Sequence, residues 1–299
     1  QQIVPCGSSL AANLGKTIRV EDFSLLWRTG GSGGYYDVYK GDTFLIPGTG
    51  CIWGGGVSDY DAVTEIDLKN QSLTTQFTDK FFKEYRNLIG VEIENNSISI
   101  IETTYLNKVV NLFLDNNSFT SINLTNLDSV EFLRLNDNDL SSINVNLFTT
   151  LTRLEVQDNV NLTNYDVSSL VNLTYLRSEK TNINSVNLTN LILLEYYNAS
   201  NTSLSVIDVS NCVLLDALQL RYTDVTALDI DNNPLIVFLD LQGCEIQIAM
   251  NNYLLIALDN SGLTNGYFRT RNYLGGTLST AAAAAKNALL EKGWTVTGI

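Results

Sequence analysis

The chain has 299 residues, a formal net charge of −14 and a pI of about 4.3. An acidic surface of this kind repels nucleic-acid phosphates and disfavours anionic membrane surfaces. Histidine is absent, which excludes His-based triads and His metal sites. No run of 18 apolar residues is present, so the sequence predicts no membrane-spanning helix. We therefore expect no nucleic-acid partner and no membrane insertion.

Residues 1–60 are rich in glycine and aromatic side chains and lack the periodicity of the rest of the chain. Segments Thr17–Val20, Tyr35–Tyr39 and Thr43–Ile46 have the composition of short strands, and Gly30–Gly34 that of a loop. Its glycines lack the spacing and context of a phosphate-binding loop. We expect a small β module that caps the following region or attaches it to other virion or surface proteins.

Two of the four cysteines, Cys6 and Cys51, flank this module. They form a disulfide or remain free thiols, and the spacing favours neither alternative. The chain starts with Gln1 and no methionine. Export followed by cleavage would account for this start, and so would processing by a virion protease.

A pattern Leu-x-x-Leu-x-Leu-x-x-Asn-x-Leu is repeated through residues 61–264. Its ten copies start at Val63, Leu88, Val109, Val130, Leu151, Leu173, Leu194, Leu215, Ile236 and, in degenerate form, Tyr253. From Leu88 to Ile236 the starts lie 21 or 22 residues apart. A fixed period of this length is typical of solenoids, in which stacked repeats share one apolar interior.

Each copy predicts a short strand followed by a turn. The Leu-x-Leu step has the period of two of a strand, and stacked copies would pair into a parallel sheet. The Asn slot would hold an inward carboxamide that bonds the backbone of its own turn and the next one. The slot contains Asn96, Asn117, Asn138 and Asn159, and later Thr181, Thr202, Thr223, Cys244 and Ser261.

The second half of each copy also alternates, with Ile122 and Leu124 inward, for example. We expect extended backbone there too and no room for a helix. Cys212 and Cys244 each replace a buried residue of the pattern, which favours small buried thiols.

This pattern resembles the leucine-rich repeat, and the 21-residue unit is similar to the short bacterial subclass called IRREKO. The resemblance covers about residues 63–263, roughly two thirds of the chain. It implies a mainly β repeat protein: a right-handed leucine-rich repeat solenoid with a parallel β-sheet on one side. It says little about function, because proteins with this repeat bind many kinds of partner.

Residues 265–299 predict a helix–strand cap. Ser279 or Thr280 is placed to N-cap a helix over about 280–292, Gly293 would end it, and Trp294 would open a closing strand. An Ala and Leu face of this helix would cover the last repeat. The segment 283–297 resembles the terminal segment of leucine-rich repeat proteins in Bacteroidetes and their phages, several of them virion or tail-associated.

Strand alternation predicts which side chains face outward from the sheet. The outward positions combine aromatic side chains and arginines, which supply flat apolar area and planar donors typical of recognition surfaces. Stacking of aromatics along a sheet is the structural alternative. The candidate binding residues are Phe113, Phe132, Arg134, Arg153, Tyr175, Arg177, Tyr196, Arg221 and Phe238.

No catalytic motif, metal-ligand spacing or phosphate loop is present, so we expect no enzyme, cofactor or metal. Asp137 and Asp139 lack the spacing of a calcium loop and are interpreted as solvated turn residues. The sequence favours a non-enzymatic recognition or adhesion protein on a virion surface or outside the cell. We expect a phage tail or virion component that contacts a host surface glycan or protein.

Three alternatives stay open. The first is a secreted bacterial adhesin, and the second is a structural virion decoration or fibre subunit whose solenoid packs against its own copies as a homo-oligomer. The third and weakest is a glycosidase, because two carboxylates alone can form such a site but no insertion builds a cleft.

Overall fold

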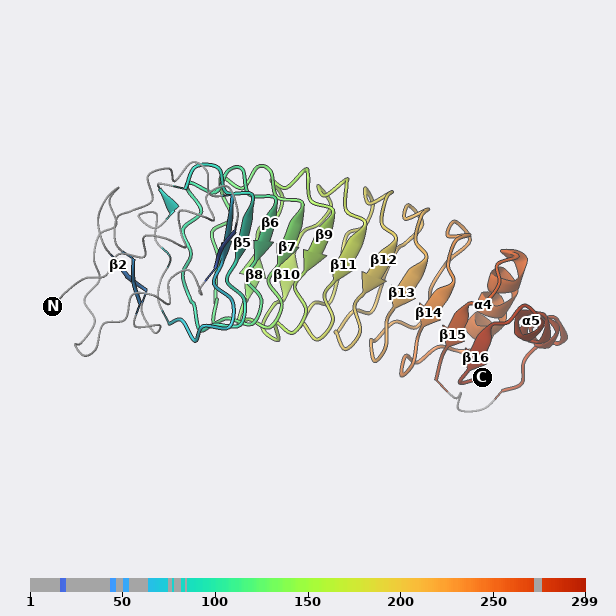
Figure 1. Cartoon of the computed structure of the whole chain (residues 1–299). Helices are drawn as coiled ribbons and strands as arrows, with labels where there is room; N and C mark the ends of the chain where they lie inside the picture. Colours follow the sequence, from blue (N-terminus) through green and yellow to red (C-terminus); the bar gives the residue numbers. More distant parts are fainter. Residues whose placement is uncertain are drawn as a thin grey trace. The chain divides into compact units, whose positions relative to one another are not determined.

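In the computed structural model the chain is described at residues 64–74, 77, 82–83, 85–271 and 276–299, and as backbone at 17–19, 44–46 and 51–53. It divides into two compact units, residues 1–140 and 141–299. Both are built as parallel-sheet solenoids, as the repeat predicts (Figure 1). Among the described residues no helix is long and apolar enough to cross a membrane.

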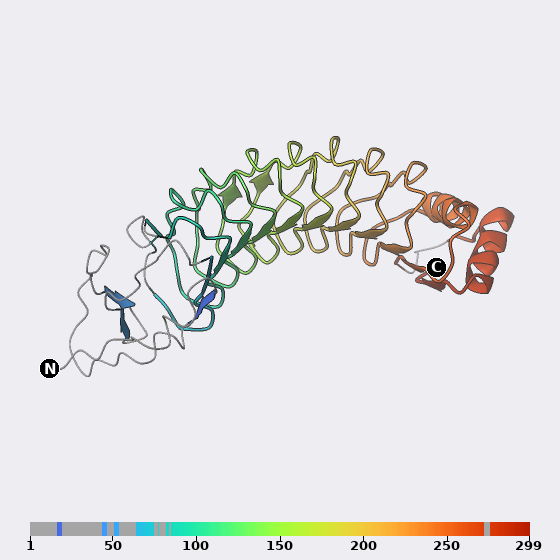
Figure 2. The same cartoon turned by 45° about the horizontal axis from the view of Figure 1, so that its top comes forward.

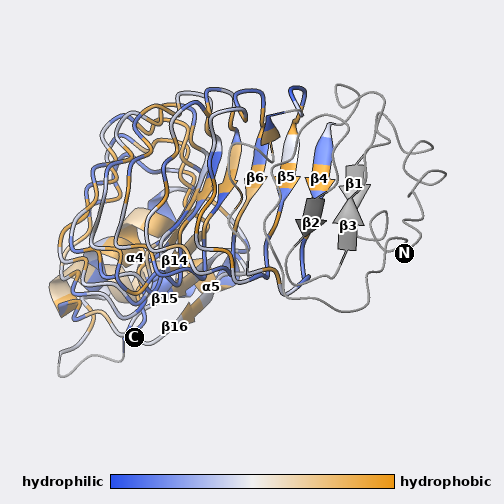
Figure 3. Ribbon diagram, turned by 90° about the vertical axis from the view of Figure 1, so that its left-hand side faces the viewer, coloured by the Kyte–Doolittle hydropathy of each residue, from blue (hydrophilic) through white to orange (hydrophobic). Residues whose placement is uncertain are grey.

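Unit 1 contains five strands that pair in parallel in chain order. They are β1 (Thr17–Arg19), β4 (Glu65–Asp67), β5 (Gly90–Glu92), β6 (Asn111–Phe113) and β7 (Phe132–Arg134). β2 (Phe44–Ile46) and β3 (Cys51–Trp53) form a separate antiparallel pair. Figure 3 shows hydrophilic and hydrophobic residues side by side within β4, β5 and β6, as alternation requires.

Two of the strands predicted in the first 60 residues are therefore confirmed, at β1 and β2. The expected role of this region is to cap or attach the repeats, and β1 in addition extends the parallel sheet by pairing with β4. Tyr35–Tyr39, the glycine loop and Cys6 lie outside the described residues, as does the side chain of Cys51. Whether Cys6 and Cys51 are bridged stays a prediction.

Unit 2 carries seven strands of the same kind. They are β9 (Arg153–Glu155), β11 (Tyr175–Arg177), β12 (Tyr196–Asn198), β13 (Ala217–Gln219), β14 (Phe238–Asp240), β15 (Tyr267–Arg269) and β16 (Thr295–Thr297). Each pairs in parallel with the next, without a register shift. Figure 2 shows β11 to β14 stacked along one edge of this unit.

The core is the column of central strand residues. Leu176, Tyr197, Leu218, Leu239 and Phe268 lie in register on neighbouring strands of unit 2, and all are fully buried. Full burial of such side chains stabilises the fold by roughly 1.5–3 kcal/mol each before the entropy cost. In unit 1, Leu112 and Leu133 pair in the same way.

The asparagine slot is confirmed, with one difference. Asn138 donates to the carbonyls of Leu135 and Asn136 in its own turn and to Leu114 in the preceding one, while its Oδ1 accepts from the Phe119 amide. The ladder thus bonds to the preceding turn rather than the next. Thr181, Thr202 and Thr223 each donate to one carbonyl three residues back. Cys244 occupies the slot as a buried free thiol, and Cys212 is also buried and free.

Two expectations about the repeats are wrong in part. The degenerate copy at Tyr253 forms no strand, because α4 (Ile248–Asn260) occupies it and places Ser261 at a helix end. The prediction that no helix fits also fails here, since this repeat spans 29 residues between Asp240 and Arg269. In the second halves, the only strands in the described residues are β8 (Ser142–Ile143) and β10 (Asn164–Tyr165), which pair in parallel.

The C-terminal cap is confirmed. α5 (Thr280–Glu291) begins after Ser279, whose hydroxyl accepts from the Ala282 amide, and Gly293 follows it at φ +83°. Its buried residues Ala282, Ala285 and Leu289 form the predicted apolar face. α5 packs against α4 and β16 (Figure 1).

Candidate functional site

The outward face of the unit 2 sheet carries three rows of side chains that run across the strands. Row A, at the first strand position, contains Arg153, Tyr175, Tyr196, Ala217, Phe238 and Tyr267. Row B, at the third position, contains Glu155, Arg177, Asn198, Gln219, Asp240 and Arg269. Row C lies two residues further along and contains Gln157, Glu179, Ser200, Arg221 and Gln242.

Row A begins with a stack of three flat side chains, those of Arg153, Tyr175 and Tyr196. The Arg153 guanidinium carbon lies 3.9 Å from the centre of the Tyr175 ring, and the Tyr175 and Tyr196 rings lie 4.4 Å apart at 8°. Because Arg153 and Tyr196 are on neighbouring strands to either side, both faces of Tyr175 are covered. Burial and the neighbouring Tyr175 raise the pKa of Tyr196 to about 12, so its hydroxyl is protonated at neutral pH.

A second stack follows in the same row. The Phe238 and Tyr267 rings lie 4.8 Å apart at 13°. The rings do not lie flat on the sheet as an open platform, because their faces are turned toward neighbouring strands. The face therefore offers ring edges and the outermost ring face of each stack.

The arginines of row B form ion pairs with buried carboxylates. Asp240 is 2% exposed and accepts two hydrogen bonds from Arg269, at 3.0 Å from Nε and 2.6 Å from Nη2. These bonds raise the pKa of Arg269. Glu155 is paired with Arg153 at 2.7 Å and lies 3.7 Å from Arg177. The guanidinium groups are thereby oriented before any partner arrives.

Two arginines of the face keep donor capacity. Arg177 bonds Glu179 through one terminal nitrogen, and its Nε has no hydrogen-bond partner. Arg221 makes a long contact of 3.8 Å to Asp240 and lies 5.7 Å from the centre of the Tyr222 ring, and its side chain is 39% exposed. Both Nε atoms are buried, so an acceptor from outside can be bound only by the terminal nitrogens of these guanidinium groups.

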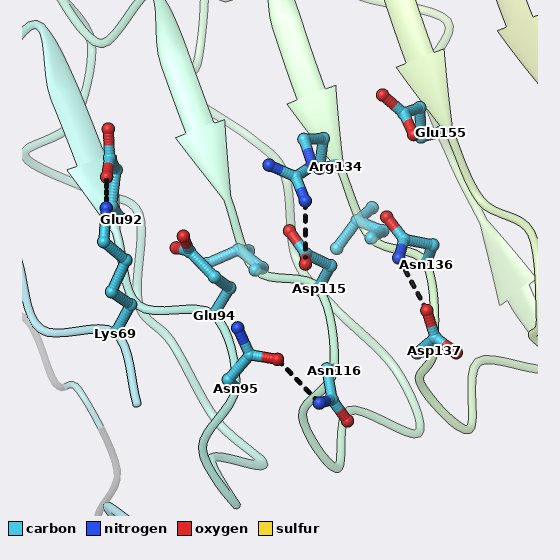
Figure 4. Close-up of polar contacts among 12 residues, drawn as sticks. Lys69, Glu92, Glu94, Asn95, Asp115, Asn116, Arg134, Asn136, Asp137 and Glu155 are labelled. Carbon is cyan, nitrogen blue, oxygen red and sulfur yellow. Dashed lines mark hydrogen bonds and ion pairs between the residues drawn. The ribbon is translucent and has the colours of Figure 1, made fainter. Parts of the chain in front are cut away.

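Unit 1 presents a smaller version of this face (Figure 4). Arg134 lies over the Phe113 ring at 5.0 Å and pairs with the buried Asp115 at 3.0 Å. Lys69 bonds Glu92 at 2.8 Å, and Asn116 donates to Asn95 at 2.7 Å. Phe132, opposite Asn111, is 37% exposed.

Glu94 is the least satisfied carboxylate of this group in Figure 4. It is 7% exposed, and its Oε2 has no hydrogen-bond partner. Burial, followed by repulsion from Asp115 and Glu92, raises the pKa of Glu94. A buried carboxylate without a hydrogen-bond partner on one oxygen lowers the stability of the fold.

Eight of the nine candidate residues lie on strands, and Arg221 lies in the turn that follows β13. Each of the two units brings its own set together. Sequence reasoning missed Tyr267 and Arg269, because the α4 insertion breaks the 21-residue spacing before them. A signal was present: Tyr-Phe-Arg at 267–269 repeats Tyr-Leu-Arg at 175–177 and Phe-Leu-Arg at 132–134.

The described residues contain no group of three His, Cys, Asp or Glu side chains arranged to hold a metal ion. Asp137 accepts a hydrogen bond from the neighbouring Asn136 and lies in a turn at φ +54°. The geometry of the face suits contact with a partner: paired charges, ring edges and carboxamides.

The sequence matches no family model and no curated protein. Solved structures are similar in fold. A leucine-rich repeat protein from Leptospira interrogans has a TM-score of 0.54 at 18% identity, covering 79% of this chain and 72% of that chain. An internalin from Listeria monocytogenes has a TM-score of 0.52 at 19% identity, covering 75% and 80%. The LRIM1/APL1C complex gives 0.52 at 18% identity, covering 62% and 36%. The chain has the leucine-rich repeat fold.

Proposed function

We propose that the chain is a non-enzymatic recognition or adhesion protein and that the outward face of its sheet is the contact surface. The observation that supports this proposal is that the arginines and rings of the face are already paired with carboxylates and with one another. Arginines and rings on successive strands are fixed by buried carboxylates and by stacking, so binding would immobilise few side chains. A merely solvated face has no need of charged groups buried to 2–7% exposure.

The distribution of charge supports the same surface. Residues 141–264 contain thirteen Asp and Glu but only four Lys and Arg. Three of those four, Arg153, Arg177 and Arg221, stand on the outward face of the sheet. The acidic charge elsewhere keeps copies apart, while the face offers both signs for specific pairing.

We propose a surface setting because segment 283–297 resembles the terminal segment of leucine-rich repeat proteins in Bacteroidetes and their phages, several of which are virion or tail-associated. In that setting the protein is a phage tail or virion component that contacts a host surface glycan or protein. Residues 1–60 would attach it to other virion or surface proteins. A secreted bacterial adhesin is the second candidate, and the similarity of fold to an internalin fits it equally. A homo-oligomeric decoration subunit is the third.

The test is binding of fluorescently labelled protein to bacterial cells and to a glycan array. We expect binding by the parent protein and its loss on Tyr175→Ala plus Tyr196→Ala, which removes the centre of row A. Tyr105→Ala is the matched control, because Tyr105 is exposed and lies outside every strand. Absence of binding to both cells and glycans would contradict the proposal, and so would equal loss in the control.

A further inference from the structure

Row A contains one small residue between two aromatic stacks. Ala217 pairs in register with Tyr196 on one side and with Phe238 on the other. Ring contacts join Tyr175 to Tyr196 and Phe238 to Tyr267, whereas among the described residues no ring contact joins Tyr196 to Phe238. The aromatic series is interrupted at Ala217 by one strand.

The space between the Tyr196 and Phe238 rings is wide enough for one flat group. Neighbouring strands lie about 4.8 Å apart, so Tyr196 and Phe238 are separated by about 9.6 Å at the backbone. A planar group in contact with two rings needs roughly 7–8 Å between them. The two existing stacks, at 4.4 Å and 4.8 Å, show that this sheet spaces flat side chains at one per strand.

Both rings that border Ala217 are held in place. The Tyr196 hydroxyl accepts a 2.8 Å hydrogen bond from Gln219, and the far face of its ring rests on Tyr175. Phe238 is supported from behind by Tyr267. Since both stacks are nearly parallel to their supports, each presents its free face toward the Ala217 strand.

Two acidic residues directly precede the row A positions of β12 and β13, while the charge of Arg177 also acts on Tyr196. Glu195 and Asp216 directly precede Tyr196 and Ala217, and their adjacent coils are joined by the Asp216 amide donating to the Glu195 carbonyl at 2.9 Å. Neither carboxylate takes part in an ion pair with any described residue. Burial and the neighbouring Glu195 raise the pKa of Asp216, as expected for two like charges without a counterion.

We propose that the Ala217 position is a receptor for an arginine side chain of a partner protein, with the guanidinium between the faces of Tyr196 and Phe238 and its charge balanced by Glu195 and Asp216. The occupant is flat and cationic, which matches two ring faces and two unpaired carboxylates. The protein already stacks its own Arg153 on Tyr175 in this row. This inference rests on the proposed function, since it names one contact within the same face.

The experiment titrates the intact protein with N-acetyl-arginine amide and, separately, with methyl glucoside. Binding is followed by the ring-current shift of the Ala217 methyl signal and by saturation transfer to the probe. We expect the arginine probe to bind in the millimolar range and methyl glucoside not to bind. Binding of the sugar alone, or of neither probe, would overturn the proposal.

Ala217→Phe is the blocking variant, because the added ring continues the stack and occupies the position. Retained stability is expected, since row A already accommodates a ring on each neighbouring strand. Binding of the arginine probe, read by saturation transfer, should fall at least tenfold. Equal binding to the variant would refute the site.

Glu195→Gln with Asp216→Asn tests the charge. We expect at least fivefold weaker binding of the arginine probe, and no change for the control Asp224→Asn, because Asp224 is exposed and lies five residues beyond the end of β13. Unchanged binding in the double variant would also refute the site. If cell binding survives Ala217→Phe but is lost on Tyr175→Ala plus Tyr196→Ala, the proposed function stands and this inference falls. If no cell or glycan is bound, the function fails, while the titration still reports on the site.

Discussion

At the scale of single residues, the buried asparagines fix the turn that follows each strand. The carboxamide of Asn138 satisfies three carbonyls and one amide of two successive turns, and the residue is only 5% exposed. No apolar side chain can replace these four bonds. Thr223 in the same slot makes one bond to a carbonyl and contacts the thiol of Cys244. The residues in this slot therefore contribute unequally to the stability of the turns along the chain.

Asn138→Ala is expected to destabilise the protein by about 3 kcal/mol or more, because it leaves several buried backbone groups without a partner. Thr223→Ala, which removes one such bond, should cost about 1 kcal/mol. The free energy of unfolding from urea titration checks both values. Hydrogen exchange at the Phe119 amide, which loses its acceptor, should accelerate in Asn138→Ala and stay unchanged in Thr223→Ala.

Glu94 gives a prediction about pH. Its pKa is raised by burial, so the folded protein holds this proton to higher pH than the unfolded chain does. Stability should therefore fall as pH rises from the unfolded-state pKa through the higher folded-state pKa. Glu94→Gln keeps the shape and removes the charge. We expect a more stable protein at pH 7 and a flatter dependence of stability on pH.

The measurement is the unfolding midpoint between pH 4 and pH 8, with Glu92→Gln as a comparison variant that removes one of the charges repelling Glu94. Glu92 is paired with Lys69 at 2.8 Å and is partly exposed, so its loss should cost at most about 1 kcal/mol. A Glu94→Gln protein that is less stable than the parent at pH 7 would show that the carboxylate has a favourable partner.

At the scale of elements, the sequence predicted the strands well because their signal is repeated. Leu112 and Leu133 share one pattern, and the side-chain period of two allows only one register that buries both. β15 and α4 were not foreseen, because the longer last repeat has no counterpart against which to align it. The apolar residues Leu254, Leu255 and Leu258 of α4 fit a strand or a helix until the length of the segment is known.

The outward rows followed from the same alternation, so the placement of the candidate residues could be predicted. What each side chain contacts could not. The pairing of Asp240 with Arg269 joins residues 29 apart across a helix. The covered faces of Tyr175 and the open position at Ala217 depend on ring orientation, which the pattern of the repeat does not specify.

The terminal helix yields a prediction at this scale. Ser279→Ala removes the hydroxyl that accepts from the Ala282 amide and should destabilise unit 2 by about 1 kcal/mol. Ser279→Asp keeps an acceptor at the helix start and should restore most of the loss. Thermal unfolding followed by circular dichroism measures both. Equal destabilisation by the two variants would show that the cap bond contributes nothing.

At the scale of the whole molecule, stability is distributed among neighbouring repeats. A repeat protein is held together by contacts between adjacent coils, so a defect acts first on the coils beside it. Leu218 is fully buried between Tyr197 and Leu239 in the middle of the unit 2 sheet. Val296, on the last strand of that sheet, contacts Phe268 on one side only.

Leu218→Ala should cost roughly 2–5 kcal/mol, because the flanking strands are fixed in register and cannot close the cavity. Its effect on hydrogen exchange should be greatest in β12, β13 and β14 and decline toward β9 and β16. Val296→Ala, at the edge, should cost less than about 1.5 kcal/mol and raise exchange only in β15 and β16. An even loss of protection across the unit in both variants would mean that its repeats unfold as one cooperative block. In that case binding at row A would be coupled to the cap, and variants of α5 should weaken it.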